Sequence, residues 1–274
     1  MASVVFHSSS AELSDPPADV SSCKKQRYIQ LVNSRRSCQL CQSLGVRNPS
    51  TCSKDEFGSK NIGPWTNWQG NLDAELMIVG QEWDGYLNYI DQEGKDQDTS
   101  PTNTRLKELL SSIGVNICLP SQSRDRAVNS QGSLFFTNAA LCLRDGRASE
   151  NNNQSKTPPV RCFRNCATSF LFPQIELVRP RLVITLGLIP YRSVLYAYGI
   201  KPKRSLSEAV SSAASIPLNE RTALIPVYHP GAWSRRRNRT LDQQVEDWKR
   251  ISTPQNLRAS GVTCLSWFWT QLRS

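Results

Sequence analysis

Arg181-Leu-Val-Ile-Thr-Leu-Gly187 is a short run of mainly aliphatic residues that ends in glycine. Three further apolar runs of similar length occupy residues 75–80, 134–141 and 222–229. Near-continuous runs of Val, Ile and Leu are typical of parallel strands that are buried on both faces. We therefore predict a central, mainly parallel sheet of four strands.

Apolar residues at helical spacing lie between and after these runs, at residues 104–113, 163–178, 190–198 and 241–251. Strands that alternate with helices favour an α/β fold, here a three-layer αβα sandwich. The turn-rich stretches 145–159 and 201–218 are expected to be surface loops. In such folds ligands bind beyond the carboxyl ends of the strands, so the residues after each run are the first candidates for a site.

The composition favours a polyanionic partner. The chain has 274 residues, with 33 Lys and Arg against 23 Asp and Glu and a formal net charge of +10. No apolar run reaches the roughly 18 residues that a membrane span needs, and residues 1–20 carry acids and prolines instead of a signal sequence. We expect a cytoplasmic monomer without membrane contact, associated with the nucleoid if the host is bacterial.

The length suits one medium domain, for which we predict residues 31–274. Residues 1–30 are rich in Ser, Pro and mixed charge, and they are expected to form a flexible N-terminal tail.

Two of the strand ends carry residues that can do chemistry. After residue 79 the chain continues as Gly80-Gln81-Glu82-Trp83-Asp84-Gly85-Tyr86, where a glycine admits a ligand close to the backbone and a carboxylate can activate water. A simple turn has the same appearance. The fourth run ends at His229, which is followed by a basic stretch. A lone histidine is often a structural residue, and a basic run is often a solvated surface. Because the two occur together at a strand end, they favour a functional role.

These strand ends resemble the motifs of the uracil-DNA glycosylases. Gly80-Gln81-Glu82 resembles their first motif, and His229-Pro-Gly-Ala-Trp-Ser234 resembles their second, in the same order along the chain. Thr137-Asn-Ala-Ala-Leu-Cys142 and the block of residues 173–187 are similar to segments of the iron-sulfur-containing, family 4/5-like members. The resemblance covers roughly residues 38–251. It implies a hydrolase that removes uracil, hypoxanthine or xanthine from DNA in base excision repair.

The resemblance implies a role for each polar residue at the strand ends. Asn138 would read the edge of the flipped base, because an amide offers both a donor and an acceptor. His229 would donate a hydrogen bond to the departing base, and Glu82 would position water and offset the positive charge on the sugar. Glu82 stands where several relatives carry Asp, so Asp84 could share or assume the water role. The altered motif also leaves open a non-catalytic DNA-binding protein with the same fold.

Substrate contacts are expected from the backbone of Gly80 and Gln81 and from an aromatic ring. The family's usual Phe before the helix near residue 104 is missing, so Tyr86 or Trp83 would stack on the base. The second motif implies a grip on DNA: Trp233 as a wedge in the base stack, and phosphate contacts from Ser234, Arg235, Arg236, Arg237 and Arg239.

The cysteines predict a metal centre. Cys38 and Cys41 form a C-x-x-C pair, and the resemblance supplies Cys142 and Cys166 as a second pair. Four thiolates suffice for a [4Fe-4S] cluster, and the same four could hold a structural zinc ion. Cys162, one helical turn from Cys166, is an alternative fourth ligand. No role is assigned to the other cysteines: Cys23, Cys52, Cys118 and Cys264.

Overall fold

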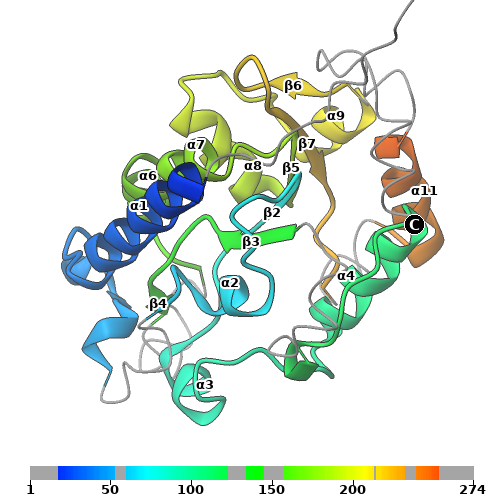
Figure 1. Cartoon of the computed structure of the whole chain (residues 1–274). Helices are drawn as coiled ribbons and strands as arrows, with labels where there is room; N and C mark the ends of the chain where they lie inside the picture. Colours follow the sequence, from blue (N-terminus) through cyan, green and yellow to red (C-terminus); the bar gives the residue numbers. More distant parts are fainter. Residues whose placement is uncertain are drawn as a thin grey trace, which may run out of the picture.

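The computed structural model describes residues 18–52, 60–122, 134–144, 157–212, 214–231 and 239–252, and it gathers them around a five-stranded sheet (Figure 1). Four strands are parallel in the order β3 (Leu134–Asn138), β2 (Leu76–Gly80), β5 (Leu182–Leu186) and β7 (Ala223–Val227). The fifth, β6 (Ile216–Pro217), pairs with β7 in the antiparallel sense. The predicted mainly parallel sheet is confirmed, with β6 added at its edge.

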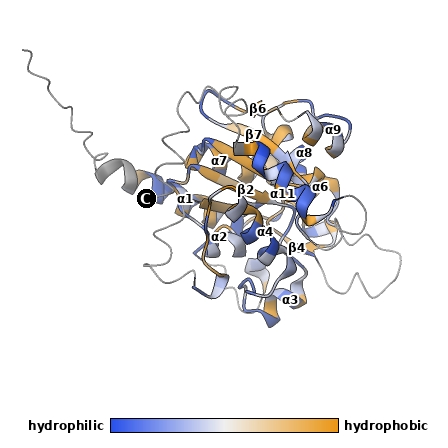
Figure 2. Cartoon of the chain, turned by 90° about the vertical axis from the view of Figure 1, so that its right-hand side faces the viewer, coloured by the Kyte–Doolittle hydropathy of each residue, from blue (hydrophilic) through white to orange (hydrophobic). Residues whose placement is uncertain are grey.

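Each central strand is buried on both faces, as the continuous apolar runs predicted. Side chains alternate across a strand, so Met77 and Val79 enter one hydrophobic core while Leu76 and Ile78 enter the other. Figure 2 shows the consequence: orange strands lie inside the molecule, and helices with bluer outer sides enclose them.

Helices cover both faces of the sheet and complete the three layers. The helices of the first core are α1 (Ala18–Arg36), α6 (Val160–Cys166), α7 (Phe172–Val178), α8 (Leu188–Ala197) and α9 (Leu206–Ser211). The helices of the second core are α2 (Pro64–Trp68), α4 (Pro101–Ser112) and α11 (Leu241–Lys249). None of the helices described is long and apolar enough to cross a lipid bilayer.

Shorter elements join these layers. Strands β1 (Val46–Arg47) and β4 (Leu143–Arg144) pair with each other, and helix α3 (Tyr86–Asp91) packs beside β4. The 3-10 turns within the described residues are η1 (Gln42–Leu44), η2 (Pro49–Thr51), η4 (Pro120–Gln122) and η7 (Arg250–Ser252). A π-helical segment, η6 (Ala167–Leu171), connects α6 to α7, so the helix predicted at residues 163–178 is one continuous helix that contains a wider turn.

Two stretches differ from the sequence-based expectation. Residues 18–30, which fell within the predicted tail, form the first part of α1, and Tyr28 of this helix meets Phe135 of β3 edge to face at 6.4 Å. The Tyr28 hydroxyl also accepts a hydrogen bond from the Ile62 amide. The predicted loop 201–218 contains α9 and β6; Ser205 caps α9 by accepting a hydrogen bond from the Glu208 amide.

Candidate functional site

The carboxyl ends of the four parallel strands bring the predicted polar residues to one edge of the sheet. Gly80 and Asn138 are direct partners in the register of β2 and β3. The chains stay together beyond the strands, because the Ala139 amide donates to Gly80 O at 2.8 Å and the Ala140 amide donates to Gln81 O at 2.9 Å. The glycine motif and the asparagine therefore form one continuous wall.

Gly80 is required by the side chain opposite it. A Cβ atom at this position would lie 2.5 Å from Asn138 Oδ1 and 2.7 Å from a ring carbon of Trp65. Asn138 is buried, and among the described residues its side-chain amide has no hydrogen-bond partner. The site thus contains a buried amide that is held over a glycine and whose donor and acceptor are available to a ligand.

His229 follows β7 and is held in one tautomer. The Gly231 amide donates a hydrogen bond to His229 Nδ1 at 2.9 Å, so Nδ1 is the acceptor and the ring proton resides on Nε2. Burial lowers the pKa of His229 to about 4, which keeps the imidazole neutral at physiological pH. A Cβ atom at Gly231 would lie 2.9 Å from two atoms of this ring.

Gly187 places the end of β5 beside His229. Its φ of +96° lies in the left-handed region that favours glycine, and it starts helix α8. A Cβ atom here would be 3.6 Å from His229 Cβ. The Gly187 amide also donates to Val227 O at 2.8 Å, which continues the β5–β7 pairing up to the histidine.

Asp84 is fully engaged in holding the loop after β2. Its Oδ1 accepts hydrogen bonds from the Gly85 amide and from Arg144 Nη2, both at 2.7 Å, and its Oδ2 accepts one from Asn88 Nδ2 at 2.6 Å. These contacts tie the loop to β4 and to the first turn of α3. Asp84 therefore acts as an anchor for the loop.

Glu82 differs from its neighbour Asp84 in having a buried oxygen without a partner. Its side chain is 10% exposed, Oε1 lies 3.5 Å from Arg144 Nε, and Oε2 accepts no hydrogen bond within the described part of the chain. Burial raises the pKa of Glu82, and the negative charge of Asp84 adds to the rise, while Gln81 and Arg144 oppose it. Arg144, which contacts both acids, did not emerge from the sequence motifs.

The two aromatic candidates lie in different surroundings. Trp83 meets Tyr89 edge to face at 5.6 Å, and its indole N–H donates to Asp96 Oδ2 at 3.4 Å. The Tyr86 ring is covered on one side by the Arg47 guanidinium, whose central carbon lies 4.7 Å from the ring centroid. The indole of Trp83 is therefore fixed by two contacts, while one face of Tyr86 is already occupied.

The first turn of α4 also reaches the site, at the place where the family's Phe was expected. Thr102 Oγ1 lies 3.2 Å from the position of a Cβ atom on Gly231. The next residue, Asn103, is buried and donates a hydrogen bond to Asp96 Oδ1 at 3.1 Å. Burial raises the pKa of Asp96 to about 6. Sequence reasoning missed this group, since its polar residues match no motif.

The four predicted cysteine ligands line one small cavity. They are Cys38, Cys41, Cys142 and Cys166, and the buried Arg35 lines it with them. Burial raises the pKa of Cys142, and the nearby thiols add to the rise, Cys166 first. None of the described cysteines forms a disulfide. Within the described ranges, no three His, Cys, Asp or Glu side chains lie close enough to hold a metal ion.

Two asparagines shape the loop that carries the C-x-x-C pair. Asn48 Nδ2 donates to the carbonyls of Arg35 at 2.7 Å and of Cys38 at 2.9 Å, which fixes the chain where α1 ends. Asn165 Nδ2 donates to Cys41 Sγ at 3.4 Å. Cys162, the alternative ligand, is buried beside Cys41 but does not line the cavity.

The predicted DNA contacts fall largely outside the described residues. These are Trp233, Ser234, Arg235, Arg236 and Arg237, and Cys264 lies outside them as well. Arg239, where the description resumes, has Nη2 2.9 Å from Asp247 Oδ1, and its guanidinium lies over the Tyr228 ring at 5.2 Å. These two contacts join the end of this stretch to α11 and to the residue before His229.

Comparisons with known proteins give matches over about two thirds of the chain or more. A family model described as the uracil DNA glycosylase superfamily matches residues 68–251, about two thirds of the chain. A type-5 uracil-DNA glycosylase from Pyrobaculum aerophilum is 26% identical over 214 residues, which are 73% of this chain and 87% of that protein.

Proposed function

Because the chain belongs to the uracil-DNA glycosylase superfamily, a family of DNA glycosylases, we propose that it removes uracil or another deaminated base from DNA by hydrolysis of the N-glycosidic bond. One observation carries the proposal: the Gly231 amide fixes a neutral His229 at the strand end that adjoins Gly187. Because this imidazole is neutral and carries its proton on Nε2, it can donate a hydrogen bond, and the contact with the Gly231 amide holds the ring in place.

Base recognition is assigned to Asn138. A base inside duplex DNA cannot present its glycosidic bond, so the nucleotide must turn out of the stack into a pocket. The Asn138 amide can pair with both O4 and N3–H of uracil, and its polar atoms have no partner among the described residues. The backbone of Gly80 and Gln81 forms the adjoining wall of this pocket.

Bond cleavage is assigned to His229 and Glu82. Positive charge develops on the sugar and negative charge on the base as the bond breaks, and preorganised groups stabilise both. His229 donates through Nε2 to the base oxygen O2. The Glu82 carboxylate positions water and offsets the charge of the sugar, and its unpaired Oε2 supports this role over one for Asp84. Trp83 is the stacking ring that we favour, because Arg47 already covers Tyr86.

DNA binding is assigned to the stretch after His229. Trp233 would fill the gap left by the extruded base, and Ser234, Arg235, Arg236 and Arg237 would contact phosphates. These roles rest on the sequence motif, while the contacts of Arg239 support a fixed end for this stretch.

A [4Fe-4S] cluster is assigned to Cys38, Cys41, Cys142 and Cys166. The four cysteines line one cavity, and four thiolates are the donor set that a [4Fe-4S] cluster takes, which supports this assignment. When bound, a cluster supplies a cross-link between the chain segments that carry its ligands. Here those segments are the end of α1, the turn after β3 and helix α6.

The proposal is tested by single-turnover excision from oligonucleotides that contain uracil, hypoxanthine or xanthine, each as single strand and duplex. We expect cleavage of at least one of the three bases, with a product that carries an abasic site. If none of the bases is released although the protein binds the DNA tightly, the chain is a non-catalytic DNA-binding protein and the proposal is wrong.

A further inference from the structure

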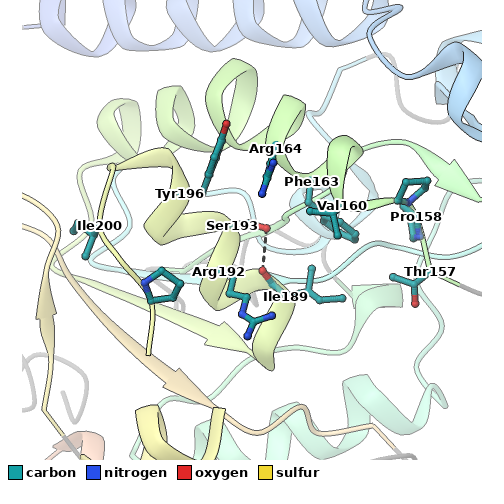
Figure 3. Close-up of a pocket in the computed structure, with 12 residues that line it drawn as sticks. Thr157, Pro158, Val160, Phe163, Arg164, Ile189, Arg192, Ser193, Tyr196 and Ile200 are labelled. Carbon is teal, nitrogen blue, oxygen red and sulfur yellow. Dashed lines mark hydrogen bonds between the residues drawn. The ribbon is translucent and has the colours of Figure 1, made fainter. Parts of the chain in front are cut away.

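A second cavity lies between helices α6 and α8 (Figure 3). Its volume is about 700 Å³. Its walls include Val160, Phe163 and Arg164 from α6 and Ile189, Arg192 and Tyr196 from α8. The function proposed above uses none of these six residues.

The cavity has a largely apolar lining, part of which the core leaves exposed to solvent. Ile189, Arg192 and Tyr196 lie on one face of α8, while Tyr191 and Val194 on its other face are buried in the core. Val160 is 67% exposed and Tyr196 is 48% exposed. A surface helix normally turns polar residues outward, so an apolar groove of this kind marks an interaction site.

The rim of the groove is positively charged. Arg164 and Arg192 belong to its walls, and none of the described lining residues is acidic. The Arg164 guanidinium lies 5.4 Å from the Tyr196 ring centroid, which holds a cation directly over the apolar wall. Arg161, Lys201 and Lys203, adjacent in the chain to lining residues, are also exposed.

The groove offers little to a small polar ligand. The Ser193 hydroxyl, which lies in the lining of the groove, already donates a hydrogen bond to Ile189 O at 2.9 Å (dashed line in Figure 3). Small-molecule sites bury most of their ligand, whereas Val160 and Tyr196 leave this groove open to solvent.

We propose that this groove binds an acidic peptide segment of a partner protein. An aromatic or aliphatic side chain of the peptide enters the cavity, and its carboxylates pair with Arg164 and Arg192. Charge complementarity argues against two other occupants. Residues 253–274 of this chain contain Trp267 and Phe268 but no acid, and a second copy of the chain carries the same net charge of +10.

The test uses the full-length protein and short fluorescein-labelled peptides in fluorescence anisotropy. The probe has Asp and Glu on both sides of a Leu-Phe pair; one control peptide replaces the acids by Asn and Gln, and another replaces Leu-Phe by Ser-Ser. We expect saturable binding of the probe alone, weakened by salt. Tyr196→Glu and Arg164→Glu should each lower its affinity about tenfold or more. Arg27→Glu, at an exposed arginine of α1, should not.

Three results would overturn the proposal. The first is equal binding of the probe and the acid-free peptide, and the second is unchanged affinity in both groove variants. The third is displacement of the probe by a duplex oligonucleotide or by a peptide of residues 253–274. This result would show that the groove binds DNA or the chain's own C-terminal segment. Base excision should stay at the wild-type rate in Tyr196→Glu and Arg164→Glu, so this inference and the proposed function can fail separately.

Discussion

The Gly231 amide donates its hydrogen bond to Nδ1 of His229 across 2.9 Å, within a turn of three residues. The same glycine leaves no room for a side chain, because a Cβ atom would lie 2.9 Å from the ring. This backbone hydrogen bond therefore fixes the tautomer of the imidazole, with its proton on Nε2.

His229→Ala should lower the single-turnover rate of base excision by about 100- to 1000-fold, since one preorganised donor to a developing charge is lost. Affinity for the substrate DNA should change only a few-fold, because the contact strengthens as the bond breaks. Gly231→Ala should also slow excision by displacing the ring, whereas Gly63→Ala, where a Cβ atom meets Leu141 at 3.7 Å, should not. Wild-type rates in His229→Ala would refute the assigned chemistry.

Glu82→Gln and Asp84→Asn make the same neutral change at two neighbouring acids. Glu82→Gln should lower the excision rate about 100-fold or more, because the proposed carboxylate charge is lost. Its thermal unfolding temperature at pH 7 should not fall. The raised pKa means that folding favours the neutral acid, so ionised Glu82 costs stability as pH rises through that pKa. Asp84→Asn should lose its ion pair with Arg144 and unfold at lower temperature, with a smaller loss of rate. If Asp84→Asn slows excision more than Glu82→Gln does, Asp84 is the residue that positions the water.

The pH dependence should separate the two groups. Burial holds the pKa of His229 at about 4, so the histidine does not titrate between pH 5 and 8. Burial raises the pKa of Glu82, so the active carboxylate is lost as pH falls through that raised value. Single-turnover rates should therefore show an acid limb that disappears in Glu82→Gln. A limb that persists in this variant would point to another group, such as Asp96.

Asn138→Ala should impair the choice of base as well as the rate. The ratio of excision rates for uracil and the other deaminated bases should fall about 10- to 100-fold, because the amide pairs with the substrate edge. Gly80→Ala should have a similar effect by forcing Asn138 Oδ1 aside. Measuring the three bases in parallel tests this; equal slowing for all of them would limit Asn138 to a structural role.

The cysteine cavity makes a spectroscopic prediction. Anaerobically purified protein should absorb visible light and contain about four iron atoms per chain. Cys166→Ser should lose iron and unfold at lower temperature, while Cys118→Ser, a buried cysteine outside the cavity, should keep its iron. Iron loss in Cys162→Ser but not in Cys166→Ser would identify Cys162, instead of Cys166, as the fourth ligand. A colourless protein with one zinc ion per chain would contradict the cluster.

The sheet could be predicted because its strands are buried on both faces and therefore have continuous apolar runs. Strand β6 has only two residues, Ile216 and Pro217, which is too short for any pattern. Helix α1 was not predicted, because its composition is polar and few of its side chains, such as Tyr28 and Val32, are buried.

Position in the chain predicted which candidate residues the fold brings together. Glu82 and His229 follow β2 and β7, Asn138 is the last residue of β3, and the topology of the sheet brings these ends together. The different surroundings of Glu82 and Asp84 could not be predicted, because they depend on Arg144, which lies 60 residues from Asp84 in the chain. Such pairings arise only when the loops fold against each other.

The π-helical segment between α6 and α7 has a consequence for how sequences of this kind are aligned. It lies between Cys166, at the cysteine cavity, and Gln174, whose Oε1 accepts a hydrogen bond from Thr137 of β3 at 2.7 Å. A wider turn stores a residue beyond what an α-helix of the same length holds, and leaves the flanking turns in phase. A homologue with one residue fewer within residues 167–171 could form a regular α-helix there and keep the flanking turns in phase. A gap between Cys162 and Cys166 would instead rotate one thiol away from the other.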